Sequence, residues 1–172
     1  RMRKRPESFR IFNNRVNLVL LALALLLGTF GVWNGRRIPA VREVTVFLKN
    51  LPPEADGMRI AVLADFHVDG LTGADFIEGI VERTNAQDPD LIVILGDFVD
   101  GSVALRGREL LPLKKLSARY GVYGIPGNHE YYSGYMEWMD FLPTLGIRML
   151  LNAHAQLLNG KLVLDLLVKE TE

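Results

Sequence analysis

The sequence contains no cysteine, only three histidines, and no segment of the form Gly-x-x-x-x-Gly-Lys-Ser/Thr. The absence of cysteine excludes disulfide bonds and metal sites built from thiolates. The absence of the phosphate-loop pattern excludes a Walker-type nucleotide-binding domain. A domain without cysteine tolerates either an oxidising or a reducing environment, so the lack of cysteine does not identify the cellular compartment.

The chain also has no net charge, because 20 Lys and Arg balance 20 Asp and Glu. This balance conceals two parts of the chain with opposite net charges. Residues 1–37 hold eight Lys/Arg and one Glu, whereas residues 38–172 hold twelve Lys/Arg and nineteen Asp/Glu. A nucleic-acid-binding surface needs a basic footprint, so we expect no nucleic-acid partner for the acidic part. Hydrophobic residues make up 49% of the chain, which excludes wholesale disorder.

A long apolar run lies near the N-terminus. Val16 to Trp33 is 18 residues long, and Asn17 and Thr29 are its only strongly polar side chains. At about 1.5 Å per residue a helix of this length spans roughly 27 Å, close to the thickness of the hydrocarbon layer. We therefore predict a basic segment over residues 1–15 and a transmembrane helix over residues 16–34 that contacts membrane lipid.

Basic residues flank this run unequally. Six precede it and three follow it closely: Arg1, Arg3, Lys4, Arg5, Arg10 and Arg15, then Arg36, Arg37 and Arg42. The positive-inside rule predicts a cytoplasmic N-terminus and an exported C-terminal domain at the cell membrane. The alternative is a cleaved signal peptide, although the run is longer than a usual signal core and no convincing small-x-small cleavage site follows it.

The remaining sequence predicts an α/β fold with helices on the faces of a sheet. We expect a linker and a first strand within residues 35–57, the strand at 41–49, and one domain over residues 58–172. Short apolar runs predict four strands, at 59–64, 91–95, 121–125 and 147–151, of which the first two are expected to be buried. Helical periodicity and breakers predict three helices. One runs from a capping box of Thr72 and Asp75 to near Gln87, one lies at 109–118, and one lies at 135–145, where Pro143 kinks or ends it. Asn159-Gly160 predicts a hairpin turn between 155–158 and 161–168.

Polar side chains follow three of these strands directly. They form the groups Asp65-Phe66-His67, Gly96-Asp97-Phe98-Val99-Asp100 and Gly127-Asn128-His129-Glu130. Each group alone could be an ordinary turn, but functional groups collect beyond the carboxyl ends of parallel strands, and all three occur in order there. Carboxylate, imidazole and amide donors suit Mn²⁺, Fe or Zn²⁺ better than a soft metal.

These three groups resemble the first signature blocks of the calcineurin-like metallophosphoesterases, and the sequence around His129 resembles the bacterial membrane-associated branch. The match runs from about Met58 to Tyr132. The resemblance implies a β-sandwich flanked by helices and a site for two divalent metal ions. It implies that Asp65 and His67 bind one ion, Asp97 bridges both and Asn128 binds the second. It further implies that His129 faces the scissile phosphate and that Asp100 hydrogen-bonds His129.

Other polar residues near these blocks are expected to play lesser parts. We interpret Glu130 and Asp69 as supporting or solvated acids rather than ligands. The family pattern continues with a further His and a Gly-His-x-His block, which this sequence does not contain. His154 is isolated, and we expect it to be a solvated or core-edge residue rather than a ligand.

Two explanations of the incomplete ligand set stay open. The chain is either a piece of a complete enzyme, which we favour, or a shortened relative without activity. An apolar stretch at residues 162–168 supports the first explanation, because as a terminal strand it would leave an unpaired hydrophobic edge. The sequence therefore predicts a membrane-anchored, metal-dependent phosphoesterase acting on a phosphate ester, with diesters slightly favoured over monoesters. A non-catalytic membrane-tethered binding module is the alternative.

Overall fold

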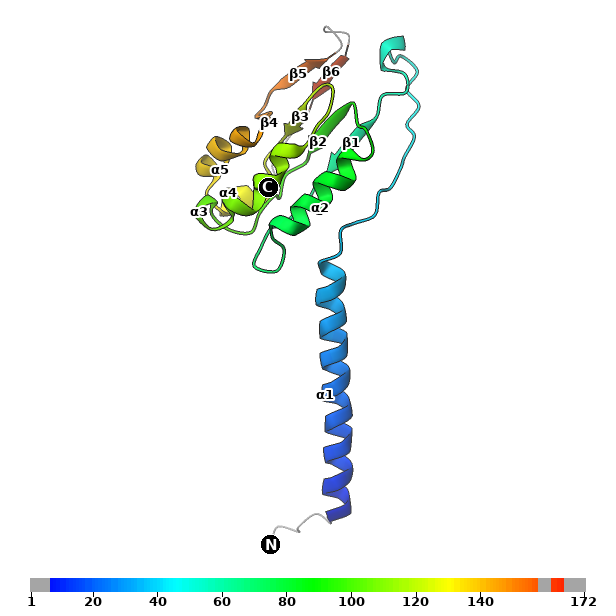
Figure 1. Cartoon of the computed structure of the whole chain (residues 1–172), viewed down its shortest axis with the longest axis vertical. Coiled ribbons are helices and arrows are strands. Elements are labelled where there is room, and N and C mark those ends of the chain that lie inside the picture. The colour runs from blue at the N-terminus through cyan, green and yellow to red at the C-terminus, as the bar shows by residue number, and fades with distance from the viewer. Residues whose placement is uncertain (1–6, 158–161, 166–172) are drawn as a thin grey trace. The chain divides into compact units, whose positions relative to one another are not determined.

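The N-terminal unit of the computed structural model is a single long helix (Figure 1). The structure describes residues 7–157 and 162–165, and side chains from residue 14 to residue 157. Helix α1 (Glu7–Gly35) contains an apolar stretch, Asn14–Gly35, of 22 residues with none buried. The hydroxyl of Thr29 donates to the carbonyls of Leu25 and Leu26 at 2.9 and 3.0 Å. The predicted helix is confirmed, and its length and composition are sufficient to cross a bilayer.

The second unit, which begins at Ile38, is built on a parallel sheet. Its strands are β1 (Ile60–Leu63), β2 (Leu91–Ile94), β3 (Val122–Gly124) and β4 (Ile147–Met149), in the order β1-β2-β3-β4 (Figure 1). Val62 pairs with Val93, and Val93 pairs with Tyr123. All four predicted strands of the sheet are confirmed. Because all four run in the same direction, their carboxyl ends lie at one edge.

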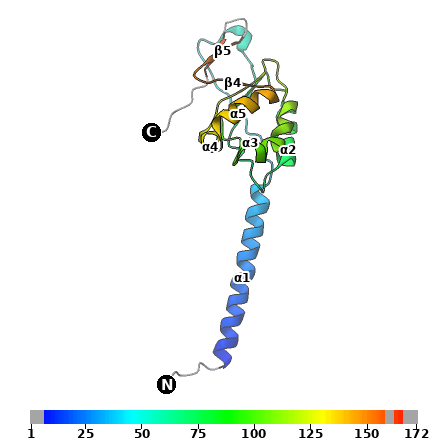
Figure 2. The same ribbon diagram turned by 90° about the vertical axis from the view of Figure 1, so that its left-hand side faces the viewer.

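Helices connect these strands (Figure 2). They are α2 (Ala74–Asn85), α3 (Val103–Arg106), η2 (Gly107–Lys115), α4 (Asn128–Tyr132), α5 (Tyr135–Phe141) and η3 (Leu142–Leu145). Ile77 of α2, Leu110 of η2 and Trp138 of α5 are fully buried in one cluster with Ile92 and Ile94 of β2. These helices therefore cover one face of the sheet.

The other face of the sheet carries a smaller core. Leu91 and Val93 of β2 point to it, since alternate residues of a strand face opposite ways. There they are grouped with Leu157 of strand β5 (His154–Leu157), which pairs antiparallel with β6 (Leu162–Asp165). The predicted hairpin strands are confirmed in part, and the Asn159-Gly160 turn lies outside the described residues. Strand β2 is buried on both faces, as its continuous apolar sequence predicts.

The predicted strand at residues 41–49 is wrong. This segment has no regular structure apart from a turn at its end, and Val44, Val46 and Phe47 are 70–92% exposed. A strand requires a hydrogen-bonding neighbour, and the sheets of the described residues provide none there. The expectation of a buried β1 is also wrong, because β1 is an edge strand whose Ile60 and Val62 are exposed.

Two helix predictions also need correction at their starts. Gly73, not Thr72, is the N-cap of α2, because the Thr72 hydroxyl is engaged in a turn with Asp69. The predicted helix at 109–118 begins earlier, as α3 and then the 3-10 helix η2, which contains Pro112. A proline inside an α-helix removes a backbone hydrogen bond and clashes with the preceding turn, which explains the tighter winding here. The helix α5 passes into η3 just before Pro143, as predicted.

Candidate metal centre

The loops that follow β1 and β2 run side by side beyond the sheet. The amides of Asp65, His67 and Val68 donate to the carbonyls of Gly96, Asp97 and Phe98 at 3.0–3.2 Å. Asp65, His67 and Asp97 have left-handed backbone conformations, with φ of 56°, 43° and 52°. This conformation is unfavourable for residues other than glycine and persists where surrounding contacts enforce it, often at functional sites. The sequence gives no direct indication of it, apart from the tolerance of Asp for this region.

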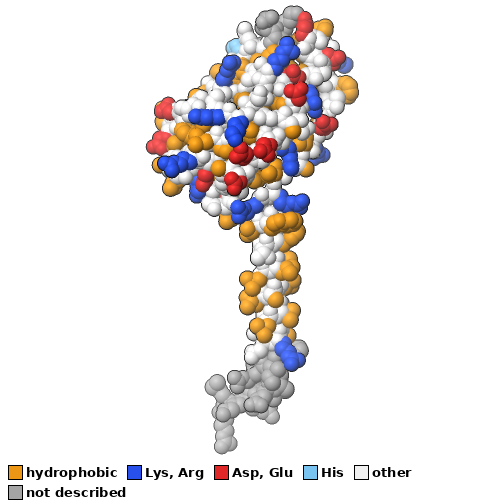
Figure 3. Space-filling model, viewed as in Figure 1, with side chains coloured by type: hydrophobic (Ala, Val, Ile, Leu, Met, Phe, Trp, Pro, Cys, Tyr) orange, Lys and Arg blue, Asp and Glu red, His pale blue; other side chains and the backbone are white. Residues whose placement is uncertain are grey.

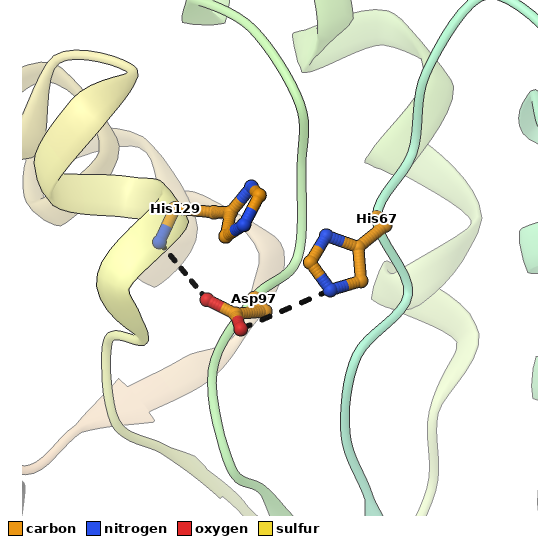
Figure 4. Close-up of side chains that lie close together, drawn as sticks. All are labelled: His67, Asp97 and His129. Carbon is orange, nitrogen blue, oxygen red and sulfur yellow. Dashed lines mark hydrogen bonds and ion pairs between the residues drawn. The ribbon is translucent and has the colours of Figure 1, made fainter.

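His67, Asp97 and His129 come together at this edge of the sheet (Figure 4). One potential ligand atom from each lies within 4.8 Å of the others. Nε2 of His67 is 3.8 Å from Oδ2 of Asp97, and the backbone N–H of His129 donates to Oδ1 of Asp97 at 2.9 Å. The two imidazole rings lie edge to face with centroids 4.4 Å apart. The three side chains thus converge from the ends of three strands, as predicted.

Asp100 fixes the orientation of both rings. Its Oδ1 contacts Nδ1 of His129 and lies 3.3 Å from Nδ1 of His67. A ring that donates from Nδ1 to this carboxylate can bind a metal through Nε2 once Nε2 carries no proton. The expected contact between Asp100 and His129 is present, and the shared contact with His67 was not predicted.

The environment of His67 favours a positive charge. Partial burial lowers the pKa of His67, but the hydrogen bond and charge of Asp100, with the charges of Asp97 and Asp65, outweigh this effect. The pKa of His67 is therefore raised above its ordinary value of 6.5. A concentration of negative charge that stabilises a proton on an imidazole also attracts a cation.

The remaining predicted ligands differ in their placement. Oδ1 of Asp65 is 3.7 Å from Nε2 of His67, so this carboxylate joins the cluster from an exposed position. Asn128 is exposed at the start of α4, next to His129, and its side chain makes no hydrogen bond within residues 14–157. The structure therefore brings Asp65, His67, Asp97 and His129 together, and it leaves the amide of Asn128 adjacent to them.

The structure also gives the positions of His154 and Asp69, which the sequence did not predict as ligands. His154 is exposed on β5, opposite Asp165, as expected for a residue that is not a ligand. The carboxylate of Asp69 accepts hydrogen bonds from the amides of Leu71 and Thr72 at 2.7 and 2.9 Å, and these bonds lower the pKa of Asp69. Asp69 thus stabilises the turn after His67.

Glu130 supports the site from a buried position, which the sequence did not specify. Its side chain is fully buried and accepts hydrogen bonds from three backbone amides of the loops after β2 and β3. The sequence offers one weak signal, a glutamate three residues after Gly127 at the start of a short helix. We expected an acid in this place to be supporting or solvated, and the structure shows that it is not solvated.

The donor set fits a divalent cation of intermediate hardness. Carboxylate oxygens of Asp65 and Asp97 lie beside Nε2 of His67. Mixed oxygen and nitrogen donors of this kind suit Mn²⁺, Fe or Zn²⁺. The residues present are therefore suited to a metal-dependent reaction at the edge of the sheet.

Comparison with known families agrees with this chemistry. Residues 58–167 match the family model of the calcineurin-like phosphoesterases. The matched region contains the parallel sheet and every member of the candidate cluster. The chain belongs to the calcineurin-like phosphoesterase family.

Individual relatives carry the same family name. A transmembrane protein with metallophosphoesterase domain from Danio rerio is 31% identical over 157 residues, which cover 91% of this chain and 36% of the relative. An uncharacterized metallophosphoesterase from Helicobacter pylori is 39% identical over 129 residues, covering 74% of this chain and 34% of the relative. The chain thus spans about a third of the length of these relatives. No solved structure matches the chain significantly.

Proposed function

We propose that this chain contributes to a membrane-anchored, metal-dependent phosphoesterase that hydrolyses phosphodiester or phosphomonoester bonds. The observation that carries the proposal is the convergence of His67, Asp97 and His129 at the strand ends of a calcineurin-like phosphoesterase domain. Diesters are slightly favoured over monoesters by family analogy alone.

The proposed site uses two divalent ions. Asp65 and His67 would hold one ion, Asp97 would contact both, and Asn128 would offer a neutral oxygen to the second. Such a pair polarises the phosphoryl group and lowers the pKa of water. Asp97 suits the shared position, because both of its oxygens face the cluster and its negative charge reduces the repulsion between two cations.

His129 is the proposed acid for the leaving group. In the proposed step, Asp100 orients the His129 ring through Nδ1, and a proton on Nε2 passes to the departing oxygen. This role keeps His129 beside the ions instead of among their ligands.

The membrane part of the proposal rests on α1. The helix is long and apolar enough to cross a bilayer, and relatives in Danio rerio and Bos taurus are named transmembrane proteins. The excess of basic residues before the apolar run supports a catalytic domain outside the cytoplasm.

A second candidate is a non-catalytic, membrane-tethered module that binds a metal or phosphate ester. Both candidates use the same cluster, and catalysis distinguishes them.

The test is hydrolysis of bis-p-nitrophenyl phosphate by the 172-residue chain in detergent, with and without Mn²⁺. We expect Mn²⁺-dependent hydrolysis that falls by more than about 100-fold in Asp97→Asn, since this change removes the negative charge of the proposed shared ligand. Asp140→Asn, an exposed residue of α5, is the matched control and should retain activity. Hydrolysis that needs no Mn²⁺, or that Asp97→Asn leaves unchanged, would contradict the proposed metal site. Mn²⁺ binding without hydrolysis would favour the binding module for the 172-residue chain.

A further inference from the structure

We propose that Glu130 is a positioning residue that locks the loop after β2 to the loop after β3 and thereby sets how Asp97 and His129 face each other. Its effect on metal binding rests on the proposed function, whereas the lock itself is independent of any metal. Glu130 is not among the candidate ligands, because its carboxylate is turned away from solvent and is fully buried.

The lock consists of three hydrogen bonds to one carboxylate. Oε2 of Glu130 accepts the N–H of Asp97 at 2.9 Å and the N–H of Gly127 at 2.7 Å. Oε1 accepts the N–H of Phe98 at 2.8 Å. The donors come from both loops, so one side chain joins them. Burial raises the pKa of Glu130, and the three N–H donors oppose this rise by stabilising the charged form.

A fourth hydrogen bond closes the connection in the opposite direction. The N–H of His129, at the start of α4, donates to Oδ1 of Asp97, in the loop after β2. Asp97 therefore donates its own amide to Glu130 and accepts the amide of the residue before Glu130. The two segments cannot separate without breaking the three of these bonds that cross between them, which accounts for the fixed Asp97–His129 arrangement.

The lock also explains the left-handed backbone at Asp97. This residue has φ of 52°, and Glu130 holds the amide of Asp97 and the amide of Phe98 that follows it. An unfavourable conformation persists when neighbouring contacts enforce it. Two bonds placed on either side of the Asp97 Cα do so here.

The chemistry of the lock requires glutamate. Glutamine has the same shape, but it replaces one oxygen by an amide group that donates, and that group would face an N–H donor. Aspartate keeps both oxygens but is one methylene shorter. Glu130→Gln is therefore the sharp test, because it replaces one of the two acceptor oxygens by a donor and leaves the volume almost unchanged.

The first measurement is hydrogen exchange of the backbone amides in the metal-free, full-length chain in detergent. We expect the amides of Asp97, Phe98 and Gly127 to be protected in the unsubstituted chain. In Glu130→Gln we expect at least one of them to exchange more than about tenfold faster, while the amides of β2 remain protected. Glu137→Gln, the same change at an exposed position of α5, is the matched control and should exchange like the unsubstituted chain.

The second measurement is Mn²⁺ affinity by calorimetry, with the Mn²⁺ electron paramagnetic resonance spectrum as a signature of ligand geometry. We expect Glu130→Gln to bind Mn²⁺ about 10- to 100-fold more weakly and with an altered spectrum, and Glu137→Gln to match the unsubstituted chain. Excess Mn²⁺ should restore part of the hydrolysis in Glu130→Gln, which a collapsed fold would not allow.

The outcomes separate this proposal from the proposed function. Unprotected amides at Asp97, Phe98 and Gly127 in the unsubstituted chain would overturn the lock, whether or not Glu130→Gln folds. Equal Mn²⁺ affinity in Glu130→Gln and Glu137→Gln would overturn the positioning role. An unsubstituted chain that binds no Mn²⁺ would contradict the proposed function, and the amide exchange would then decide on Glu130 alone.

Discussion

Two glycines allow the loops after β2 and β3 to approach within backbone contact. A Cβ on Gly96 would lie 2.3 Å from the amide nitrogen of Gly127. A Cβ on Gly127 would lie 2.1 Å from Oδ1 of Asp97. No real side chain fits at such distances, so the two glycines provide the space in which the Asp97 carboxylate meets His129.

The prediction at this scale is the substitution Gly127→Ala. Gly127 has φ of −98°, which alanine also adopts, and the substitution therefore acts mainly through the new methyl group. The new methyl group should displace the Asp97 carboxylate, weaken Mn²⁺ binding more than about tenfold and lower the free energy of unfolding by about 1–3 kcal/mol. Calorimetry and urea denaturation measure the two effects.

The control for this substitution is Gly73→Ala. A Cβ on Gly73 meets no atom within 4 Å, and this residue is the N-cap of α2. Gly73→Ala should leave Mn²⁺ affinity unchanged. If Gly127→Ala binds Mn²⁺ as tightly as Gly73→Ala, the close approach of the loops is irrelevant to the site.

The sequence predicted much of the candidate site because parallel strands place their carboxyl ends together. That rule alone brings Asp65, His67, Asp97 and His129 to one edge of the sheet. It does not reveal which acids are buried. Glu130 resembles a surface residue in sequence, because charged residues are almost never fully buried, and only the folded backbone shows three donors that compensate its charge.

At the scale of elements, helix α2 holds the segment that precedes β1. The guanidinium of Arg83 donates from Nη1 to the carbonyls of Ile38 and Pro39 at 2.9 and 2.7 Å. Ile38 packs against the core cluster beside Gly79, where a Cβ would lie 1.9 Å from Cδ1 of Ile38. The absence of a side chain at Gly79 therefore leaves the space that the Ile38 side chain occupies.

The substitution Arg83→Met tests this attachment. It keeps most of the aliphatic stem and removes both hydrogen bonds, which lie at an exposed position and together contribute about 1 kcal/mol. Trypsin should therefore cleave after Arg42 about fivefold faster, since 1 kcal/mol corresponds to about that factor in the population of the open state. Arg108→Met, at an exposed position of η2, should not alter the rate. Equal rates in both variants would show that Arg83 does not hold the segment.

The elements that the sequence predicted well are those that neighbouring elements stabilise. The apolar runs that form β2 and β3 are buried and paired on both sides, so their apolar pattern alone identifies them as strands. Residues 41–49 have an equally good alternating pattern and remain extended without a ladder. Strand propensity describes a fit to a half-buried surface, and pairing depends on a partner that the pattern does not contain.

At the scale of the whole molecule, the chain combines an apolar helix with an acidic α/β unit. Helix α1 has exposed leucine on all sides, which is unfavourable in water and favourable in lipid. Basic residues stand at both ends of the apolar run, and Arg37 lies 4.8 Å above the ring of Trp33. Tryptophan and arginine at a helix end are typical of the membrane–water interface.

The absence of cysteine makes the orientation directly measurable. Single-cysteine variants Ser8→Cys and Asn50→Cys place one thiol before and one after the span. Treating intact cells with a membrane-impermeant maleimide should label Asn50→Cys and not Ser8→Cys, because the basic N-terminal segment is expected in the cytoplasm. Labelling of Ser8→Cys alone would reverse the orientation. The unsubstituted chain, which cannot react, gives the background.

The left-handed backbone at Asp65, His67 and Asp97 restricts how these positions can vary during evolution. Asparagine is one of the few residues besides glycine and aspartate that readily adopt this conformation. An Asp→Asn exchange at position 65 or 97 therefore removes the charge without disturbing the main chain. A branched residue would remove the charge and also distort the main chain. Lineages that lose catalysis should therefore accumulate asparagine or glycine at these two positions first. Such a residue indicates that the charge was lost while the backbone conformation was kept.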